Sequence, residues 1–148
     1  EYLNIELLKL RDEMKRRVGE LKTLKLDFEL DFWTRHLYKQ VTQSFTYGFF
    51  ESCCILCRAI IESISERYIA FKGYKDYLVG KEKDKKMITL PGILQNLGVS
   101  TDVIKSYRKI SGKADNILHN RNMPTSEVDA LSSINALHFF IEKFPKML

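Results

Sequence analysis

Apolar residues recur every three or four positions along most of the chain, which is the spacing of one face of an α-helix. Residues 1–30 carry such a series as a heptad seam of about three and a half repeats, interrupted only by Arg17. Such a seam needs a partner surface, which is either another helix of this chain or a second copy of it. The seam consists of Leu3, Leu7, Leu10, Met14, Leu21, Leu24 and Phe28.

The remainder of the chain, residues 31–148, predicts a helical bundle. A second amphipathic helix runs up to Gly48, where glycine either ends the helix or allows close packing. The segment from Phe49 to Tyr68 is apolar on more than one face, so we expect it to be the central helix of the bundle. Residues 72–86 lose the apolar pattern and are rich in lysine, which predicts an exposed loop.

Capping residues delimit the helices of the C-terminal half. Proline is tolerated in a first helical turn, glycine favours a C-terminal cap, and serine or threonine favours an N-terminal cap. The signals are Thr89-Leu90-Pro91, Gly98, Ser100 or Thr101, and Thr125 or Ser126, with Pro145 as the final stop. Together the patterns predict an all-α fold, a bundle of about five to six helices with a long N-terminal helix.

Length and composition support one ordinary globular domain. The chain has 148 residues, and its seven glycines and three prolines are too few for a turn-rich all-β fold. No apolar run of about eighteen residues is present, so we expect a protein without a membrane partner. The chain begins with Glu1 and has no signal peptide, which favours a piece of a longer parent chain with other domains, or a processed product.

Net charge and cysteine content bear on the kind of partner and on the cellular compartment. The formal charge of +5 permits an anionic partner such as RNA, although lysines that only solvate the surface explain it as well. Cys53, Cys54 and Cys57 are too close together for a disulfide framework, which indicates a reducing compartment such as the cytoplasm. No second CxxC completes a metal site, so we interpret the three cysteines as core residues.

Candidate chemistry centres on one histidine. The sequence contains no Walker loop, dinucleotide fingerprint, HExxH motif or nucleophile elbow. His119 ends an apolar helix beside Lys113, Asn116 and Arg121, where the helix dipole stabilises an imidazolium. Such a group can act as a general acid or base on RNA, whose 2′-hydroxyl can attack without a metal. His138 faces His119 if the last two helices pack antiparallel.

Two segments resemble a known superfamily. The first is Arg58-Ala59-Ile60-Ile61-Glu62, which follows Gly48, and the second is Ala114-Asp115-Asn116-Ile117-Leu118-His119-Asn120, which precedes Pro124-Thr125 and the last helix. Together they resemble HEPN-superfamily domains, in particular a poorly characterised branch appended to defence and restriction proteins. The resemblance covers about residues 32 to 145.

The resemblance implies a bundle that forms a homodimer, with histidine motifs paired at the dimer cleft. Active HEPN members are ribonucleases that need no metal or cofactor, and an arginine precedes their histidine by a few residues. Carried over, the histidine falls on His119 and the arginine on Gly112, Lys113 or Ala114, so that lysine keeps the charge but not the bidentate fork. The other residues implicated are Asn116 and Glu62 as polar partners of the motif, and Arg58, Arg108 and Arg121 as phosphate ligands.

Three functions remain open from the sequence. The first is a HEPN-like ribonuclease, or a degenerate relative of one, with His119 as general acid or base. The second is a non-catalytic dimerisation module of a larger, defence-type protein, which the N-terminal heptad seam and the lysine in place of the motif arginine favour. Apart from the resemblance, Arg58 and Glu62 are an i,i+4 ion pair on an apolar helix, which we expect to be partly buried. The third is a nucleotide-binding bundle, which ranks last because nothing in the sequence marks a phosphate cradle.

Overall fold

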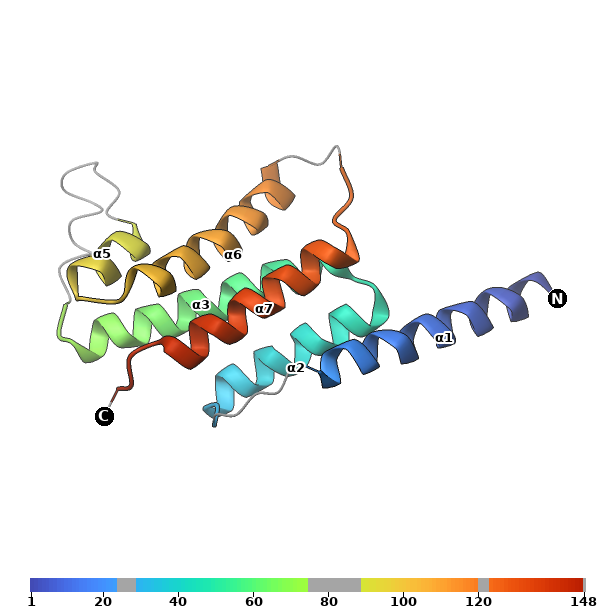
Figure 1. The fold of residues 1–148 in the computed structure, drawn as a ribbon, viewed down its shortest axis with the longest axis horizontal. Helices are drawn as coiled ribbons and strands as arrows, with labels where there is room; N and C mark the ends of the chain where they lie inside the picture. Colours follow the sequence, from blue (N-terminus) through green and yellow to red (C-terminus); the bar gives the residue numbers. More distant parts are fainter. Residues whose placement is uncertain (24–28, 75–88, 120–122, 148) are drawn as a thin grey trace.

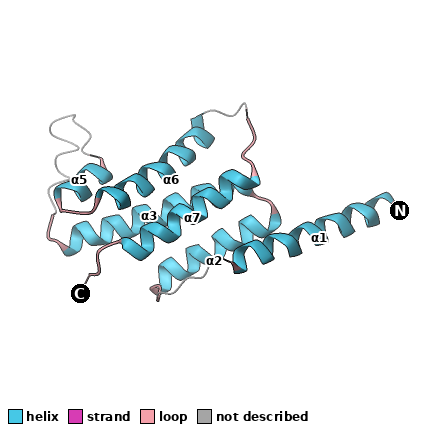
Figure 2. Ribbon diagram, viewed as in Figure 1, coloured by secondary structure: helices cyan, strands magenta, loops and turns pink. Residues whose placement is uncertain are grey.

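The computed structural model describes residues 1–23, 29–74, 89–119 and 123–147. All regular structure in these ranges is helical, with no strand (Figures 1 and 2). The helices are α1 (Tyr2–Lys22), α2 (Phe32–Tyr47), α3 (Phe50–Phe71), α5 (Leu90–Asn96), α6 (Thr101–His119) and α7 (Glu127–Lys143). The prediction of an all-α bundle with a long N-terminal helix is confirmed. Most of the predicted lysine-rich loop lies outside the described residues.

Helix α3 is the centre of the bundle, as its apolar circumference predicts. It packs against α2, α6 and α7, and the short α5 covers the junction of α3 and α6 (Figure 1). The largest fully buried side chains come from five helices, for example Phe45, Ile61, Leu94, Ile110 and Phe140. The three cysteines are fully buried in this core and are free thiols. Burial raises the pKa of the Cys54 thiol to about 11, as expected for a core residue.

The helix ends follow the predicted capping residues. Gly48 ends α2 in the left-handed conformation, with φ of +83°, and Gly98 follows α5 with φ of +85°. Ser126 caps α7 in a capping box, in which its hydroxyl accepts a hydrogen bond from Asp129 N and the Asp129 carboxylate accepts one from Ser126 N. Ser100 rather than Thr101 caps α6, since its hydroxyl accepts a hydrogen bond from Val103 N at 3.4 Å.

Only the C-terminal half of α1 packs on the bundle, and a polar residue attaches it. Arg17, which interrupts the predicted seam, is the buried residue of α1, whereas Leu3, Leu7 and Leu10 are exposed. Within the described chain, the bundle therefore shields only the later seam positions: Met14 is partly buried, and Leu21 is partly buried and packs against the core. The last two seam positions, Leu24 and Phe28, lie outside the described residues.

The Arg17 guanidinium is held from several sides. Its Nε donates to Glu127 Oε1 at 2.8 Å, its Nη1 to the carbonyl of Thr46 at 3.2 Å, and its Nη2 to Glu13 Oε2 at 2.9 Å. The cation also lies 5.2 Å from the centre of the Phe50 ring. These contacts join α1 to the end of α2 and to the starts of α3 and α7.

Candidate functional site

Helix α6 presents an exposed polar face whose three exposed cations lie in its first half, after the exposed Asp102 of the first turn. Its opposite face is buried in the core through Val103, Tyr107, Ile110 and other apolar residues, which fixes the rotation of the helix. The exposed positions then recur at helical spacing from the first turn to the last. We call this set the α6 face, and it consists of Lys105, Arg108, Lys109, Gly112, Asn116 and His119.

A hollow of about 390 Å³ lies between the α6 face and α7. Three of the residues implicated by the sequence, Arg108, Lys113 and Asn116, line it together, and Lys109 joins them. Lys113 is not free in this hollow, because its Nζ lies 3.0 Å from Asp129 Oδ1. The Ser126 amide, with help from Lys113, holds the pKa of the Asp129 carboxyl below its usual value. The hollow therefore offers two exposed cations, one neutralised cation and an amide.

A second hollow of about 440 Å³ lies on the other side of α6, against α3 and α5, and shares Arg108 with the first. Arg58 spans it: its Nε donates to Glu62 Oε1 at 2.7 Å and its Nη1 to Asp115 Oδ1 at 2.5 Å. The hydrogen bond that Arg58 donates to Glu62, with the Asp115 charge, raises the pKa of Arg58 above its usual value. The Arg58–Glu62 pair is partly buried, with 28% and 35% of the side chains exposed, as expected.

The structure places His119 at the exposed end of α6, outside the sets of residues that line these two hollows. It lies one helical turn beyond both Asn116 and Asp115, so the three side chains occupy neighbouring positions on the helix surface. Glu62 relates to the histidine only indirectly, through Arg58 and then Asp115. Arg121, the remaining phosphate ligand implied by the resemblance, lies outside the described residues.

The expectation that His138 faces His119 is wrong, although α6 and α7 do pack antiparallel. Lys113 pairs with Asp129 and the Tyr107 ring packs on Phe140, which places His138 opposite the first half of α6. His138 instead turns to α2, where its Nε2 lies 2.7 Å from the Tyr38 hydroxyl. Burial lowers the pKa of His138, and burial raises that of Tyr38 to about 12, so both groups are neutral core partners.

Sequence reasoning missed three contributors to this region. Lys105 and Lys109 add cations to the α6 face, and their helical spacing to Asn116 and His119 was the signal that would have identified them. Asp115 entered the sequence analysis only as part of the segment that contains His119, because its pairing with Arg58 joins residues 57 positions apart. Such a contact depends on how α3 and α6 align, which no local pattern encodes.

No family model, curated protein or solved structure matches the chain. Any function is therefore inferred from the residues and geometry of the site. Within the described segments, no group of three or more histidine, cysteine or acidic side chains is arranged to hold a metal ion. None of the helices described is long and apolar enough to cross a membrane.

Proposed function

We propose that this chain is a HEPN-like domain that binds RNA along the α6 face and cleaves it without a metal, with His119 as general acid or base. The observation that carries the proposal is the exposed imidazole at the end of a helix face that presents three exposed cations: Lys105, Arg108 and Lys109. Phosphate contacts of this kind position a nucleic acid without reading its sequence. The Asn116-x-x-His119 spacing adds the resemblance described above.

In this proposal the role of each residue follows from its position along α6. Arg108 and Lys109 bind phosphate in the hollow beside α7, and the Asn116 amide hydrogen-bonds to the backbone one turn before His119. His119 then removes the proton of a ribose 2′-hydroxyl, which attacks the adjacent phosphorus, and a proton is returned to the leaving 5′-oxygen. Asp115, held by Arg58, lies one turn before the imidazole and limits the space around it on that side of the helix.

A cation close to the reacting phosphate completes this site. Lys113 is bound to Asp129, and Arg108 precedes His119 by eleven residues, which is about 16 Å along a helix. The proposal therefore assigns the charge to Arg121, two residues after the histidine in the sequence, or to a second subunit that approaches the end of α6.

The test is cleavage of a structured RNA in the presence of EDTA by the wild type, His119→Ala and His36→Ala. His36 is a matched control because it is also exposed but lies on α2, stacked on Trp33. The proposal predicts loss of at least about a hundredfold in rate for His119→Ala, the scale of general acid–base catalysis, and wild-type cleavage by His36→Ala. Equal rates in all three proteins, or no cleavage by any of them, would contradict the enzymatic role.

A second candidate function, an interaction module without catalysis, is favoured by a different observation. The apolar residues in the N-terminal half of α1 have no partner in the described chain, and Lys113 is neutralised. This candidate predicts association of the chain through α1 together with absence of RNA cleavage. Light scattering of the wild type and of Leu7→Glu measures the association, and a wild type that stays monomeric while it cleaves RNA would contradict it.

A further inference from the structure

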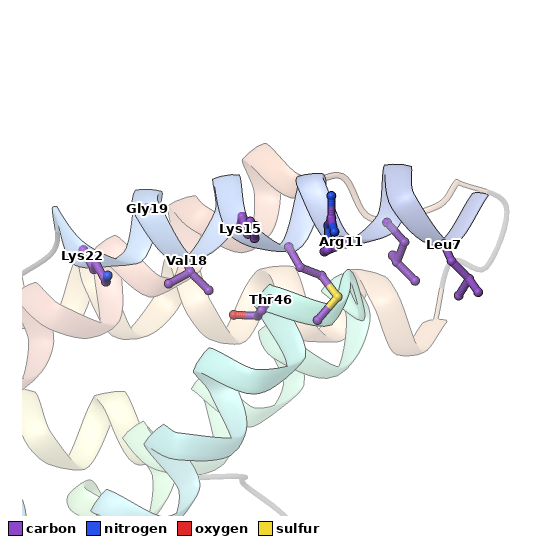
Figure 3. Close-up of a pocket in the computed structure, with 9 residues that line it drawn as sticks. Leu7, Arg11, Lys15, Val18, Gly19, Lys22 and Thr46 are labelled. Atoms are coloured by element: carbon purple, nitrogen blue, oxygen red, sulfur yellow. The ribbon is translucent and has the colours of Figure 1, made fainter. Parts of the chain in front are cut away.

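The hollow beside α5, where α5 meets α3 and α6, combines apolar residues with charges of both signs. Helix α5 contributes Leu90 and Pro91 to its lining, and α3 and α6 contribute Arg58, Glu62 and Asp115. The hollow that runs along α1, by contrast, is mostly apolar (Figure 3). With a volume of about 440 Å³, the hollow beside α5 is as large as many small-molecule sites. A ligand that suits this lining has an apolar face and a polar edge.

The charges that line this hollow balance, unlike those of the hollow beside α7. Two arginines and two carboxylates line the hollow beside α5, and they are Arg58, Arg108, Glu62 and Asp115. Three cations and one carboxylate line the hollow beside α7. A phosphate group is therefore attracted to the hollow beside α7, whereas the hollow beside α5 favours a ligand without net charge.

The two carboxylates beside α5 keep room for further hydrogen-bond donors. Arg58 donates from Nε to Glu62 Oε1 and from Nη1 to Asp115 Oδ1, so it occupies one oxygen of each. An ionised carboxylate has about four lone-pair sites and only accepts hydrogen bonds. The Glu62 and Asp115 side chains are 35% and 51% exposed, so a ligand can reach them. Acceptors held in place thus lie beside an arginine that can donate.

The two hollows meet on α6 at Arg108 and Gly112, which line both of them. These residues lie one helical turn apart on the same side of the helix. A Cβ at Gly112 would meet no atom within 4 Å, so packing within the described chain does not require a glycine here. Glycine inside a helix is also less stable than alanine. What Gly112 provides is a low point on α6 across which a ligand can extend from one hollow to the other.

We propose that the hollow beside α5 binds an unpaired guanine base of an RNA strand whose phosphate lies on Arg108 in the hollow beside α7. This inference deepens the RNA-binding role proposed above and rests on it. Proteins read unpaired RNA bases by hydrogen bonds along their edges and by contacts on their flat faces. The edge of the base meets Glu62 and Arg58, and its face lies against Leu90 and Pro91.

Guanine matches the hydrogen-bonding groups of this hollow better than the other bases do. Its N1–H and 2-amino group are neighbouring donors, which suit the two oxygens of Glu62. Its O6 lies next to N1–H on the same edge and accepts from an arginine, the usual partner of guanine. Adenine and cytosine place an acceptor nitrogen beside their amino group, and uracil has a single N–H between two carbonyl groups. Each of these bases would turn an acceptor toward the carboxylate.

The position of this hollow along α6 separates base binding from cleavage. Gly112 precedes His119 by seven residues, which is about 10 Å along a helix. The bound guanine therefore belongs to a neighbour of the nucleotide that His119 acts on. Its recognition is expected to change the affinity for RNA and to leave the rate of the bound complex unaffected.

The experiment compares three labelled single-stranded RNAs by fluorescence anisotropy with the full chain: oligouridine, the same strand with one central guanosine, and the same strand with inosine at that position. Inosine differs from guanosine only in lacking the 2-amino group. The wild type is expected to bind the guanosine strand at least about fivefold more tightly than the inosine strand, the lower limit for a bidentate base contact.

Glu62→Gln is expected to remove this preference and to keep the affinity for oligouridine. Glu66→Gln is the matched control, because it removes the same charge from an exposed position of α3 one turn later, outside the lining of the hollow. It is expected to keep the preference. Gly112→Leu, which fills the low point on α6, is expected to reduce the preference without unfolding the chain. Thermal unfolding checks that all three variants remain folded.

The outcomes separate this inference from the RNA-binding role. Binding of all three strands with equal affinity would overturn the guanine site while the RNA contact of α6 stands. A guanosine preference that survives in Glu62→Gln would also overturn the guanine site, because the base would then be read elsewhere. A wild type that binds none of the strands, even at low salt, would overturn both proposals.

Discussion

Replacement of Arg17 by alanine is expected to release α1 from the bundle. The side chain is 7% exposed and makes its contacts to Glu127 and Thr46 across more than one helix junction. No other residue of α1 is buried, so the docking of this helix depends on the Arg17 guanidinium, on the more exposed Arg16–Glu127 pair and on the partly buried Leu21. The substitution therefore removes the most shielded of the contacts that hold α1 in place.

The free energy lost in Arg17→Ala depends on which partners of Arg17 keep a hydrogen bond after the substitution. Glu127 keeps its two hydrogen bonds from Arg16, at 2.6 and 2.9 Å, so its carboxylate is not orphaned when Arg17 is removed. Glu13 is 58% exposed and regains water. What is lost is chiefly one charge-assisted hydrogen bond in a shielded place, about 1.5–3 kcal/mol, and the cation–π contact with Phe50, about 0.5–1 kcal/mol. The expected loss is about 2–4 kcal/mol of α1 docking free energy.

The assay is urea unfolding followed by far-ultraviolet circular dichroism, with limited proteolysis to report on α1 alone. Arg17→Ala is expected to unfold in two steps, with cleavage in α1 before the bundle melts. Arg16→Ala is the matched control: it also removes a partner of Glu127, but its own side chain is 51% exposed, so a smaller loss is expected. Equal stability and equal proteolysis of the two variants would refute the role given to Arg17.

Two further predictions concern the backbone and the pH dependence of the bundle. Gly48→Ala is expected to cost about 1–3 kcal/mol in calorimetry and to exceed the cost of Gly98→Ala, since both glycines have positive φ but a Cβ at Gly48 would lie 3.2 Å from Arg17 Nη1. Equal costs would contradict this reasoning. Burial lowers the pKa of His138 below its usual 6.5, so the unfolded chain binds the additional proton as pH falls below 6.5. Stability should then fall toward the lowered pKa with a slope of at most about 1.4 kcal/mol per pH unit, and an unchanged slope in His138→Gln would refute this assignment.

Local signals in the sequence accounted for the helices and their ends. Gly48, Gly98 and Ser126 act through backbone conformation and hydrogen bonds within a few residues, so their effects can be predicted from a short window. The apolar circumference of α3 likewise predicted its central place. Arg17 could not be interpreted in this way, because its partner Glu127 is 110 positions away and a lone arginine in a heptad seam resembles an interruption.

The sequence predicted which residues of α6 belong to the candidate site, but not which contacts they make with other helices. The sequence identified His119, Asn116 and Lys113 as neighbours, and helical geometry alone places them along the last turns of α6. The sequence did not show that Lys113 is bound to Asp129, because that pair depends on the packing of α6 against α7. The sequence also did not show that His138 contacts Tyr38, because that contact depends on the packing of α7 against α2.

The claim that the α6 face contacts RNA is tested most directly by the salt dependence of binding to a labelled single-stranded RNA, measured by fluorescence anisotropy. A variant with Lys105→Gln and Lys109→Gln loses two of its exposed cations, while a control with Lys39→Gln and Lys146→Gln loses the same charge from α2 and the C-terminal segment. The account predicts that the first variant binds more weakly, with the slope of log affinity against log salt reduced by about 1.4, or roughly 0.7 per phosphate contact, and that the control keeps the wild-type slope. Equal slopes in both variants would contradict it.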